Sequence, residues 1–223
     1  MSRHTPNFMK NNNFIKWIFG TILLVSIVLA VSFIGGTFYP NKWAKQKLET
    51  EFHIKELNQV NLLGLKEPEF VYQDKKSFLD TTKRCVDYLN YTTDMRYRVP
   101  TSIIIAMAGV ESGWGKSRFA LEGNALFGVR TWDLDHVPHM KAKGNPDASW
   151  GVKKYKTKCQ SVKDMIRILN NHPAYKDFRE ERERQIDEGK WDYRALMVRM
   201  SAWSTNPDYH EIILQAIVDN KLP

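Results

Sequence analysis

The chain has 223 residues, of which 43% are hydrophobic and 12% aromatic, and its formal net charge is +8. This composition can supply a buried core and excludes an intrinsically disordered protein. The positive charge suits an anionic polymer, but no zinc-spaced cysteines or RNP-like aromatic strand accompany it, so no nucleic-acid partner is expected.

The first expected element is a membrane helix over 17–38, a segment without a charged residue. A helix of roughly 20 apolar residues spans the hydrocarbon core of a bilayer. Residues 1–16 are polar and predict a short, disordered cytoplasmic lead. A cleaved signal peptide, with "AVS" at 30–32 as its cleavage site, is the alternative; the long apolar stretch and the lead before it favour an uncleaved anchor.

A juxtamembrane stalk is expected over 39–74, which is mixed in charge and has no sustained hydrophobic period. From Lys75 onward, apolar residues recur at three- and four-residue spacing and predict a helix. A second helix is expected to begin near Pro100, a residue suited to the first turn, and to be central in the domain because it is apolar all round.

The segment 125–157 breaks the helical pattern, and "ALFGVR" and "WGVKKYKT" predict short strands on either side of a polar loop. Helices are expected to resume at Ser161, where "SVKD" resembles a capping box, and to continue over 193–200 and 207–219, the last with Asn206 as its cap. The charges in "REERERQ", around 179–184, predict a solvated face. Residues 75–223 are therefore expected to form a mainly helical α+β domain with a small β lobe.

The chain has two cysteines, Cys85 and Cys159. In an oxidising compartment this pair can form a disulfide, whereas two separately buried thiols fit the sequence equally well.

A carboxylate ends the apolar run in "IIIAMAGVESGWGKSRFA", residues 103–120. At the end of a buried helix, both the macrodipole and the apolar surroundings disfavour the ionised form of Glu111, and a carboxylic acid kept neutral is what a general acid requires. Gly113 and Gly115 can end the helix, and Trp114 between them offers a flat face for a sugar ring.

Three motifs in order resemble the glucosaminidase family of glycoside hydrolases, family 73, and most closely its bacterial Bax-like members. They are "AMAGVESGWGKSRFALEGNALFGV", "KKYKTKCQSVKDMIRILNNHPAY" and "SAWSTNPDYHEIILQAI". The resemblance covers 75–223. It implies a lysozyme-like fold that cleaves β-1,4 bonds next to N-acetylglucosamine in peptidoglycan, with Glu111 as proton donor to the leaving oxygen.

The resemblance also implies the other site residues. The family's "NLFG" element corresponds here to Asn124, Leu126, Phe127 and Gly128, and its final motif to Trp203, Thr205, Asn206, Pro207 and Tyr209. Trp203 and Asn206 depart from the family pattern, which leaves Tyr209 as the candidate for a functional phenol. The candidate substrate-binding residues are Trp114, Asn124, Phe127, Tyr155 and Trp203.

A second carboxylate is harder to assign, because no glutamate occurs between 130 and 155. Asp133, Asp135 and Asp147 are the acids of the β lobe, and an acetamido group of the substrate could replace a second carboxylate. His136 and His139 lie beside these aspartates, but Asp and His in a polar hairpin are more often solvated, so neither a metal nor a cofactor is expected.

These observations favour a peptidoglycan β-N-acetylglucosaminidase anchored in the inner membrane, with its catalytic domain on the periplasmic or extracytoplasmic side. Two alternatives remain. A lytic transglycosylase shares the fold and a single acid, although its "GLMQ"-like element is replaced by "ALFGV". A non-catalytic wall-binding scaffold would keep the fold without turnover.

Overall fold

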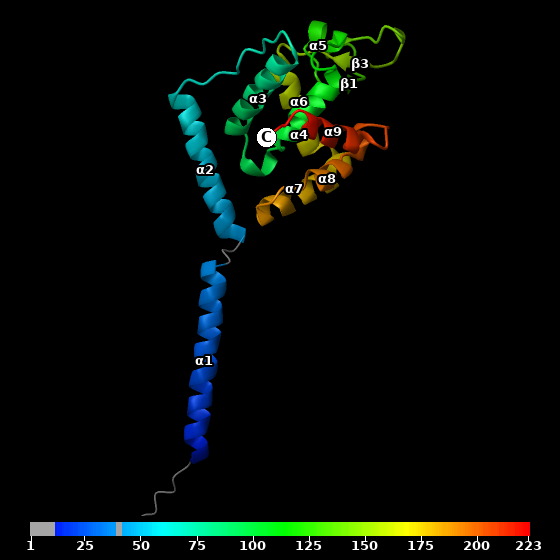
Figure 1. The fold of residues 1–223 in the computed structure, drawn as a ribbon. Coiled ribbons are helices and arrows are strands. Elements are labelled where there is room, and N and C mark those ends of the chain that lie inside the picture. Colours follow the sequence, from blue (N-terminus) through cyan, green and yellow to red (C-terminus); the bar gives the residue numbers. More distant parts are fainter. Residues whose placement is uncertain (1–11, 39–41) are drawn as a thin grey trace, which may run out of the picture. The chain divides into compact units, whose positions relative to one another are not determined.

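The structure, a computed structural model, describes residues 12–38 and 42–223. Most of these residues are helical, and the strands form one small sheet (Figure 1). The chain divides into two compact units, Met1–Glu51 and Phe52–Pro223. The prediction of a mainly helical α+β fold with a small β lobe is confirmed.

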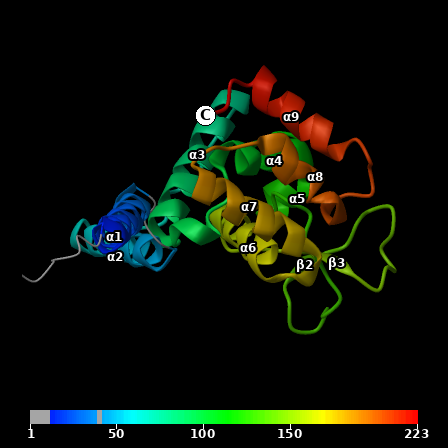
Figure 2. The same ribbon diagram turned by 90° about the horizontal axis from the view of Figure 1, so that it is seen from below.

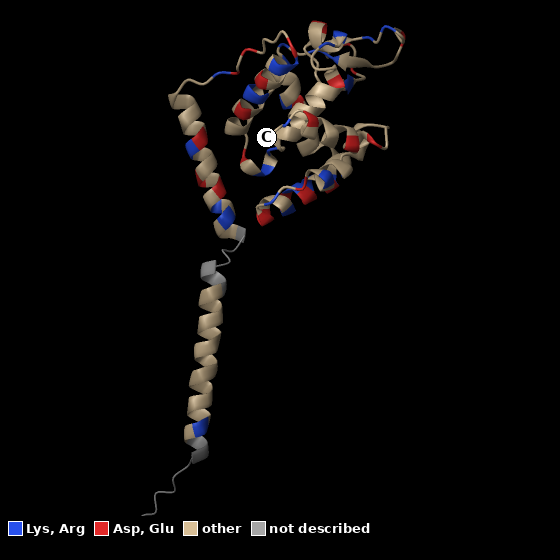
Figure 3. Ribbon diagram, in the orientation of Figure 1, with Lys and Arg blue, Asp and Glu red and all other residues tan. Residues whose placement is uncertain are grey.

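Helix α1 (Asn12–Phe38) contains Ile15–Ile34, a stretch long and apolar enough to cross a membrane. Figure 3 shows α1 almost without charged residues, whereas α7 (Lys176–Glu188) alternates acidic and basic ones. Residues 12–16, which the sequence assigned to a disordered lead, are helical and belong to α1. The rest of the lead, 1–11, lies outside the described residues.

Helix α2 (Lys42–Leu62) occupies most of the segment expected to be a stalk. Its sequence is rich in Lys, Glu, Gln and Leu, which are good helix formers even without a hydrophobic period. After α2 the chain is irregular up to residue 74, and Tyr72 packs edge-on against Phe78 of the domain core with ring centroids 5.2 Å apart. The end of the segment expected to be a stalk therefore packs on the domain.

Helix α4 (Thr101–Ser112) is central in the domain, as predicted, and its residues 102–109 are buried. It packs against α3 (Lys75–Thr92) and α9 (Tyr209–Asp219), and both views show it surrounded by other helices (Figures 1 and 2). Pro100 lies at the N-cap, one residue before the helix, and not in its first turn.

The β lobe is smaller than predicted. Strands β1 (Arg130–Thr131), β2 (His139–Met140) and β3 (Gly151–Lys153) form an antiparallel sheet in the order β1-β3-β2. It follows the short helix α5 (Arg118–Gly123) and gathers at one side of the domain (Figures 1 and 2). The "ALFG" part of the first predicted strand is coil, with its first three residues buried, because Gly128 has a φ of +60°, which is incompatible with a strand.

Two helix starts differ from the prediction. Helix α6 (Lys158–Asn171) begins three residues before Ser161, because the Thr157 side chain accepts a hydrogen bond from the backbone N–H of Gln160. Ser161 lies inside the helix, so the capping box expected there was wrong. Helix α9 begins at Tyr209, and Asn206 instead forms an Asx turn in which its Oδ1 accepts from the N–H of Asp208.

The prediction that 179–184 form only a solvated face was wrong. Glu181, Arg182 and Gln185 of α7 are buried, and each has polar partners. Arg184 and Gln185 donate to Glu181, and Arg182 donates to Asn170 at 2.7 Å. Charge alternation misled the prediction, because these residues recur at three- and four-residue spacing and form the side of α7 that packs on neighbouring elements, including α8 (Tyr193–Val198).

Cys85 of α3 and Cys159 of α6 form a disulfide, with their Cα atoms 5.7 Å apart. Both are fully buried. The sequence left this pairing open, and the structure resolves it.

Candidate active site

Glu111 lies in the last turn of α4, where the buried helix reaches the surface. The helix ends at Ser112, and the next residue, Gly113, has a φ of +58°, in the left-handed region that glycine adopts at little cost. The buried aliphatic run before Glu111 fixes the position of its backbone, and its side chain is half-buried.

Two donors from the C-terminal part of the chain reach the same oxygen of this carboxyl group. The hydroxyl of Tyr209 donates to Glu111 Oε1 at 2.7 Å, although the two residues are 98 positions apart. The indole N–H of Trp203 donates to Oε1 at 3.2 Å. Because Oε1 accepts both hydrogen bonds, Oε2 is the oxygen that carries the proton when the group is neutral.

Burial raises the pKa of the Glu111 carboxyl above its usual range, and the hydrogen bonds from Tyr209 and Trp203 lower it by a smaller amount. The pKa of Tyr209 is also raised, first by burial and then by the neighbouring Glu111, so the phenol stays protonated and remains a donor. The pair therefore consists of an acid whose neutral form is favoured and a donor that stabilises its conjugate base.

Glu111 opens into a cleft of about 730 Å³. One side of this cleft is helical and includes Tyr175 and the 201–205 segment, and the other comes from the β lobe and includes Arg130 and Trp132. Within residues 42–223, Glu111 is the only carboxylate among the cleft-lining residues.

Aromatic rings line the helical side. The ring of Trp203 meets Phe127 edge-on, with centroids 6.3 Å apart at 89°, and lies tilted against Tyr175 at the same separation. Phe127 is only 3% exposed, so the Trp203 ring packs against a buried ring. Of the candidate site residues, the structure brings together Glu111, Tyr209, Trp203 and Phe127.

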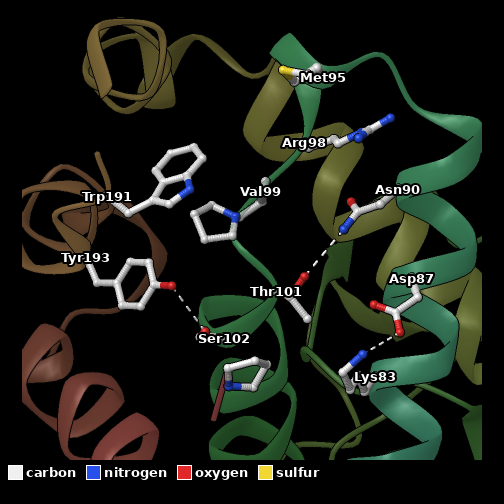
Figure 4. Close-up of a pocket in the computed structure, with 12 residues that line it drawn as sticks. Lys83, Asp87, Asn90, Met95, Arg98, Val99, Thr101, Ser102, Trp191 and Tyr193 are labelled. Carbon is white, nitrogen blue, oxygen red and sulfur yellow. Dashed lines mark hydrogen bonds and ion pairs between the residues drawn. The ribbon is translucent and has the colours of Figure 1, made fainter. Parts of the chain in front are cut away.

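A second cavity, of about 470 Å³, lies between α3, the start of α4 and the start of α8 (Figure 4). Several of its polar side chains bond to one another: Lys83 pairs with Asp87, and Ser102 donates to the Tyr193 hydroxyl. None of the candidate site residues lines it. The chemistry expected from the sequence therefore belongs to the Glu111 cleft.

The family described as mannosyl-glycoprotein endo-beta-N-acetylglucosaminidase matches residues 89–222, a range that contains the whole cleft. This chain belongs to the glucosaminidase family.

Relatives are similar over the same region. Protein bax of Escherichia coli is 30% identical over 128 residues, which are 55% of this chain and 43% of that protein. Exo-glucosaminidase LytG of Bacillus subtilis is 30% identical over 132 residues, 56% of this chain and 45% of that protein. The chain thus matches less than half the length of these curated relatives. The catalytic domain of the autolysin Auto from Listeria monocytogenes aligns with a TM-score of 0.49 and 18% identity, covering 75% of this chain and 94% of that one.

Three residues proposed to bind substrate in this glucosaminidase domain lie elsewhere, and within 42–223 none of them lines the cleft. Trp114 packs its ring so closely on Gly109 that a Cβ there would lie 2.3 Å from the indole, and Lys75 Nζ stands 3.9 Å from the ring centroid. Asn124, with a φ of +53°, donates to the carbonyls of Tyr155 and Lys156. The Tyr155 hydroxyl donates to Asp164 at 2.8 Å.

The aspartates of the β lobe lie away from the lining of the cleft in the described residues. Asp133 accepts from the backbone N–H of His136 and pairs with its ring at 2.8 Å, and both side chains are exposed. Asp135 and Asp147 are also exposed, and none of the three aspartates lines the cleft in the described residues.

Sequence reasoning missed Arg130, Trp132 and Tyr175 as lining residues. The sequence does contain an indication for the first two. Arg130 and Trp132 lie two residues apart, in and just after a strand, and side chains at this spacing face the same way. Tyr175 follows a proline in a short 3₁₀ turn, Pro173–Tyr175, and nothing in its local sequence indicates that it faces the cleft.

Proposed function

We propose that this protein is a peptidoglycan hydrolase, a β-N-acetylglucosaminidase that cleaves β-1,4 glycosidic bonds with Glu111 as general acid. The observation that carries this proposal is the Glu111 carboxyl itself: it is half-buried, opens into the cleft and accepts both nearby hydrogen bonds on one oxygen. Membership of the glucosaminidase family supports the reaction class.

In the proposed step, Glu111 Oε2 gives its proton to the glycosidic oxygen as the bond between that oxygen and the anomeric carbon breaks. Positive charge grows on the sugar, and the carboxyl becomes a carboxylate. The hydrogen bonds from Tyr209 and Trp203 strengthen as the negative charge forms on the carboxylate, since bonds to charged acceptors are stronger. Burial therefore keeps the acid protonated before the step, and the two donors stabilise the product of proton loss.

Glu111 is the only carboxylate lining the cleft in the described part of the chain, so a second carboxylate is not the favoured nucleophile. An acetamido group on the sugar can take this role, in which case its carbonyl oxygen attacks the anomeric carbon. Water then completes the hydrolysis.

We place the active domain outside the cytoplasm. Residues 17–38 would span the inner membrane, 1–16 would remain in the cytoplasm and 39–74 would link the span to the catalytic domain over 75–223. The apolar stretch Ile15–Ile34 supports the span, although a signal sequence would have the same character. The disulfide between Cys85 and Cys159 supports an oxidising compartment.

A lytic transglycosylase is the second candidate, favoured by the single carboxylate in the cleft. Such an enzyme needs no water and forms an anhydro end on the muramic acid. The chemistry of the new ends therefore separates it from a hydrolase.

The test is digestion of purified peptidoglycan by the full chain in detergent, comparing the wild type with Glu111→Gln and analysing the reduced products by mass. We expect reducing N-acetylglucosamine ends that disappear in the variant. Glu122→Gln, which removes an exposed glutamate outside the cleft, is the matched control and should leave the products unchanged. Anhydromuramyl ends would identify a transglycosylase, and no products from the wild type would favour a wall-binding role.

A further inference from the structure

The β side of the cleft presents a cation and an aromatic ring on one face of the sheet. Arg130 and Thr131 form β1, and Trp132 follows directly. Because side chains alternate along a strand, the buried Thr131 points inward while its two neighbours point the opposite way. Both neighbours line the cleft that contains Glu111, and the Trp132 side chain is 66% exposed.

Arg130 differs from the other arginines of the domain. Each of the other arginines from Arg84 to Arg199, both included, donates a side-chain hydrogen bond to a carboxylate, a hydroxyl, an amide or a backbone carbonyl. The guanidinium of Arg130 instead lies over the ring of Trp150, 4.1 Å from its centroid. In the described part of the chain it has no ion pair. Its N–H groups are therefore available to a ligand, and the Trp150 ring restricts its orientation.

The charge balance of the cleft favours a negatively charged ligand. Among the described lining residues, Arg130 is the only lysine or arginine and Glu111 the only carboxylate. When Glu111 is protonated, as its role as general acid requires, the lining carries a net positive charge. A planar guanidinium binds a carboxylate through two parallel N–H bonds.

We propose that Arg130 and Trp132 form the specificity element of this cleft: Trp132 stacks on a sugar ring, and Arg130 binds a carboxylate carried by the adjoining muramic acid. This inference rests on the proposed function for its substrate, and it adds that the cleft distinguishes an anionic glycan from a neutral polymer of N-acetylglucosamine. The carboxylate can come from two sources, the lactyl group of the muramic acid or its stem peptide.

The test measures binding, so that it is independent of turnover. The full chain carrying Glu111→Gln is kept in detergent and titrated with three probes: peptide-free glycan strands with free lactyl carboxylates, strands that retain stem peptides, and neutral chitohexaose. Adding Arg130→Gln should weaken binding of a carboxylate-bearing probe about tenfold or more, because a charge-assisted bidentate contact is lost. Binding of chitohexaose should change by less than about twofold, since it offers Arg130 no charge.

Further variants separate a specific contact from a general charge effect. Lys143→Gln removes one positive charge from an exposed position of the β lobe outside the cleft, and it should leave all three affinities unchanged. Arg130→Lys should restore only part of the loss, because an ammonium lacks the planar pair of donors. Trp132→Ala should weaken the binding of all three probes by the same factor, since stacking does not depend on substrate charge.

The outcomes are decisive in both directions. A loss on peptide-free strands assigns the lactyl carboxylate, and a loss confined to peptide-bearing strands assigns the stem peptide. An equal loss on chitohexaose, or no loss on any probe, overturns the role of Arg130. If selective binding is found while the wild type releases no products, the proposed hydrolysis fails and the specificity element stands. If the wild type releases products but binding is not selective, the specificity element fails and the proposed hydrolysis stands.

Discussion

The two sides of the cleft differ in how their functional groups are held. On the helical side, Tyr209 and Trp203 both donate hydrogen bonds to Glu111, and Tyr209 is only 8% exposed. On the β side, Arg130 and Trp132 are exposed and lack such bonds within the described residues. A proton transfer depends on fixed geometry, whereas recognition of a polymer depends on accessible faces. Substitutions on the first side should therefore change kcat, and those on the second should change KM and selectivity.

The largest effect is expected from Glu111→Gln, which keeps the size of the side chain and removes the transferable proton. We expect kcat to fall by about 10²- to 10⁴-fold, the range typical of a lost general acid. Binding of glycan strands should change little, because the amide can still accept from Tyr209. Initial rates and titrations on the same preparation test this split. A variant that keeps more than about a tenth of wild-type kcat would exclude Glu111 as the acid.

The second effect is on stability and should involve both sides of the cleft. The disulfide joins Cys85 before α4 to Cys159 after the β lobe, a separation of 74 residues that encloses Glu111, Arg130 and Trp132. Replacing both cysteines by serine should cost about 2–5 kcal/mol of unfolding free energy. This corresponds to a melting temperature lower by about 5–15 °C. Thermal unfolding with and without reductant tests it.

Reductant provides the control for the disulfide prediction. It should lower the melting temperature of the wild type toward that of the double variant and leave the double variant unchanged. Equal melting temperatures for wild type and variant would show that the cross-link does not contribute to stability.

The third effect comes from Tyr209→Phe, which keeps the ring and removes the hydroxyl. The donor stabilises the Glu111 carboxylate, so kcat should fall by about tenfold to a hundredfold. The hydrogen bond lowers the pKa of Glu111, and its loss should raise that pKa. In the proposed step the protonated acid is the active form, so activity should be lost as pH rises through the pKa, and the alkaline limb of the pH–rate profile should move to higher pH.

Tyr193→Phe is the matched control, since it removes another partly buried phenol whose hydroxyl accepts from Ser102 away from the cleft. Its pH–rate profile should overlay that of the wild type. If the alkaline limb of Tyr209→Phe moves to lower pH instead, Tyr209 does not stabilise the carboxylate as described.

The sequence predicted the helical side better than the β side, for physical reasons. The apolar run of α4 has a single burial pattern, which placed Glu111 at the exit of a core helix. The strands are only two or three residues long, so alternation extends over too few residues to predict where a strand begins and ends. Helix α7 buries Glu181 and Arg182 through partners that are distant in sequence or on neighbouring turns. The sequence did not indicate that the Trp114 ring packs on Gly109, because it does not reveal that Trp114 has a φ of +57°.

The smallest effect is expected from two variants that test whether the β side contributes a reacting group. Asp133→Asn and Asp135→Asn remove the carboxylates nearest in sequence to Trp132. Both side chains are exposed, and Asp133 is bonded within its own turn to His136. Neither aspartate lines the described cleft, so neither can accept a proton from a water positioned opposite Glu111 without rearrangement of the loop.

We expect kcat within about twofold of wild type for each variant, because exposed substitutions away from a site change stability and activity little. A loss of a hundredfold in either variant would mean that this loop closes over the substrate and supplies the second carboxylate, and the distinction between a reacting side and a recognising side would no longer hold.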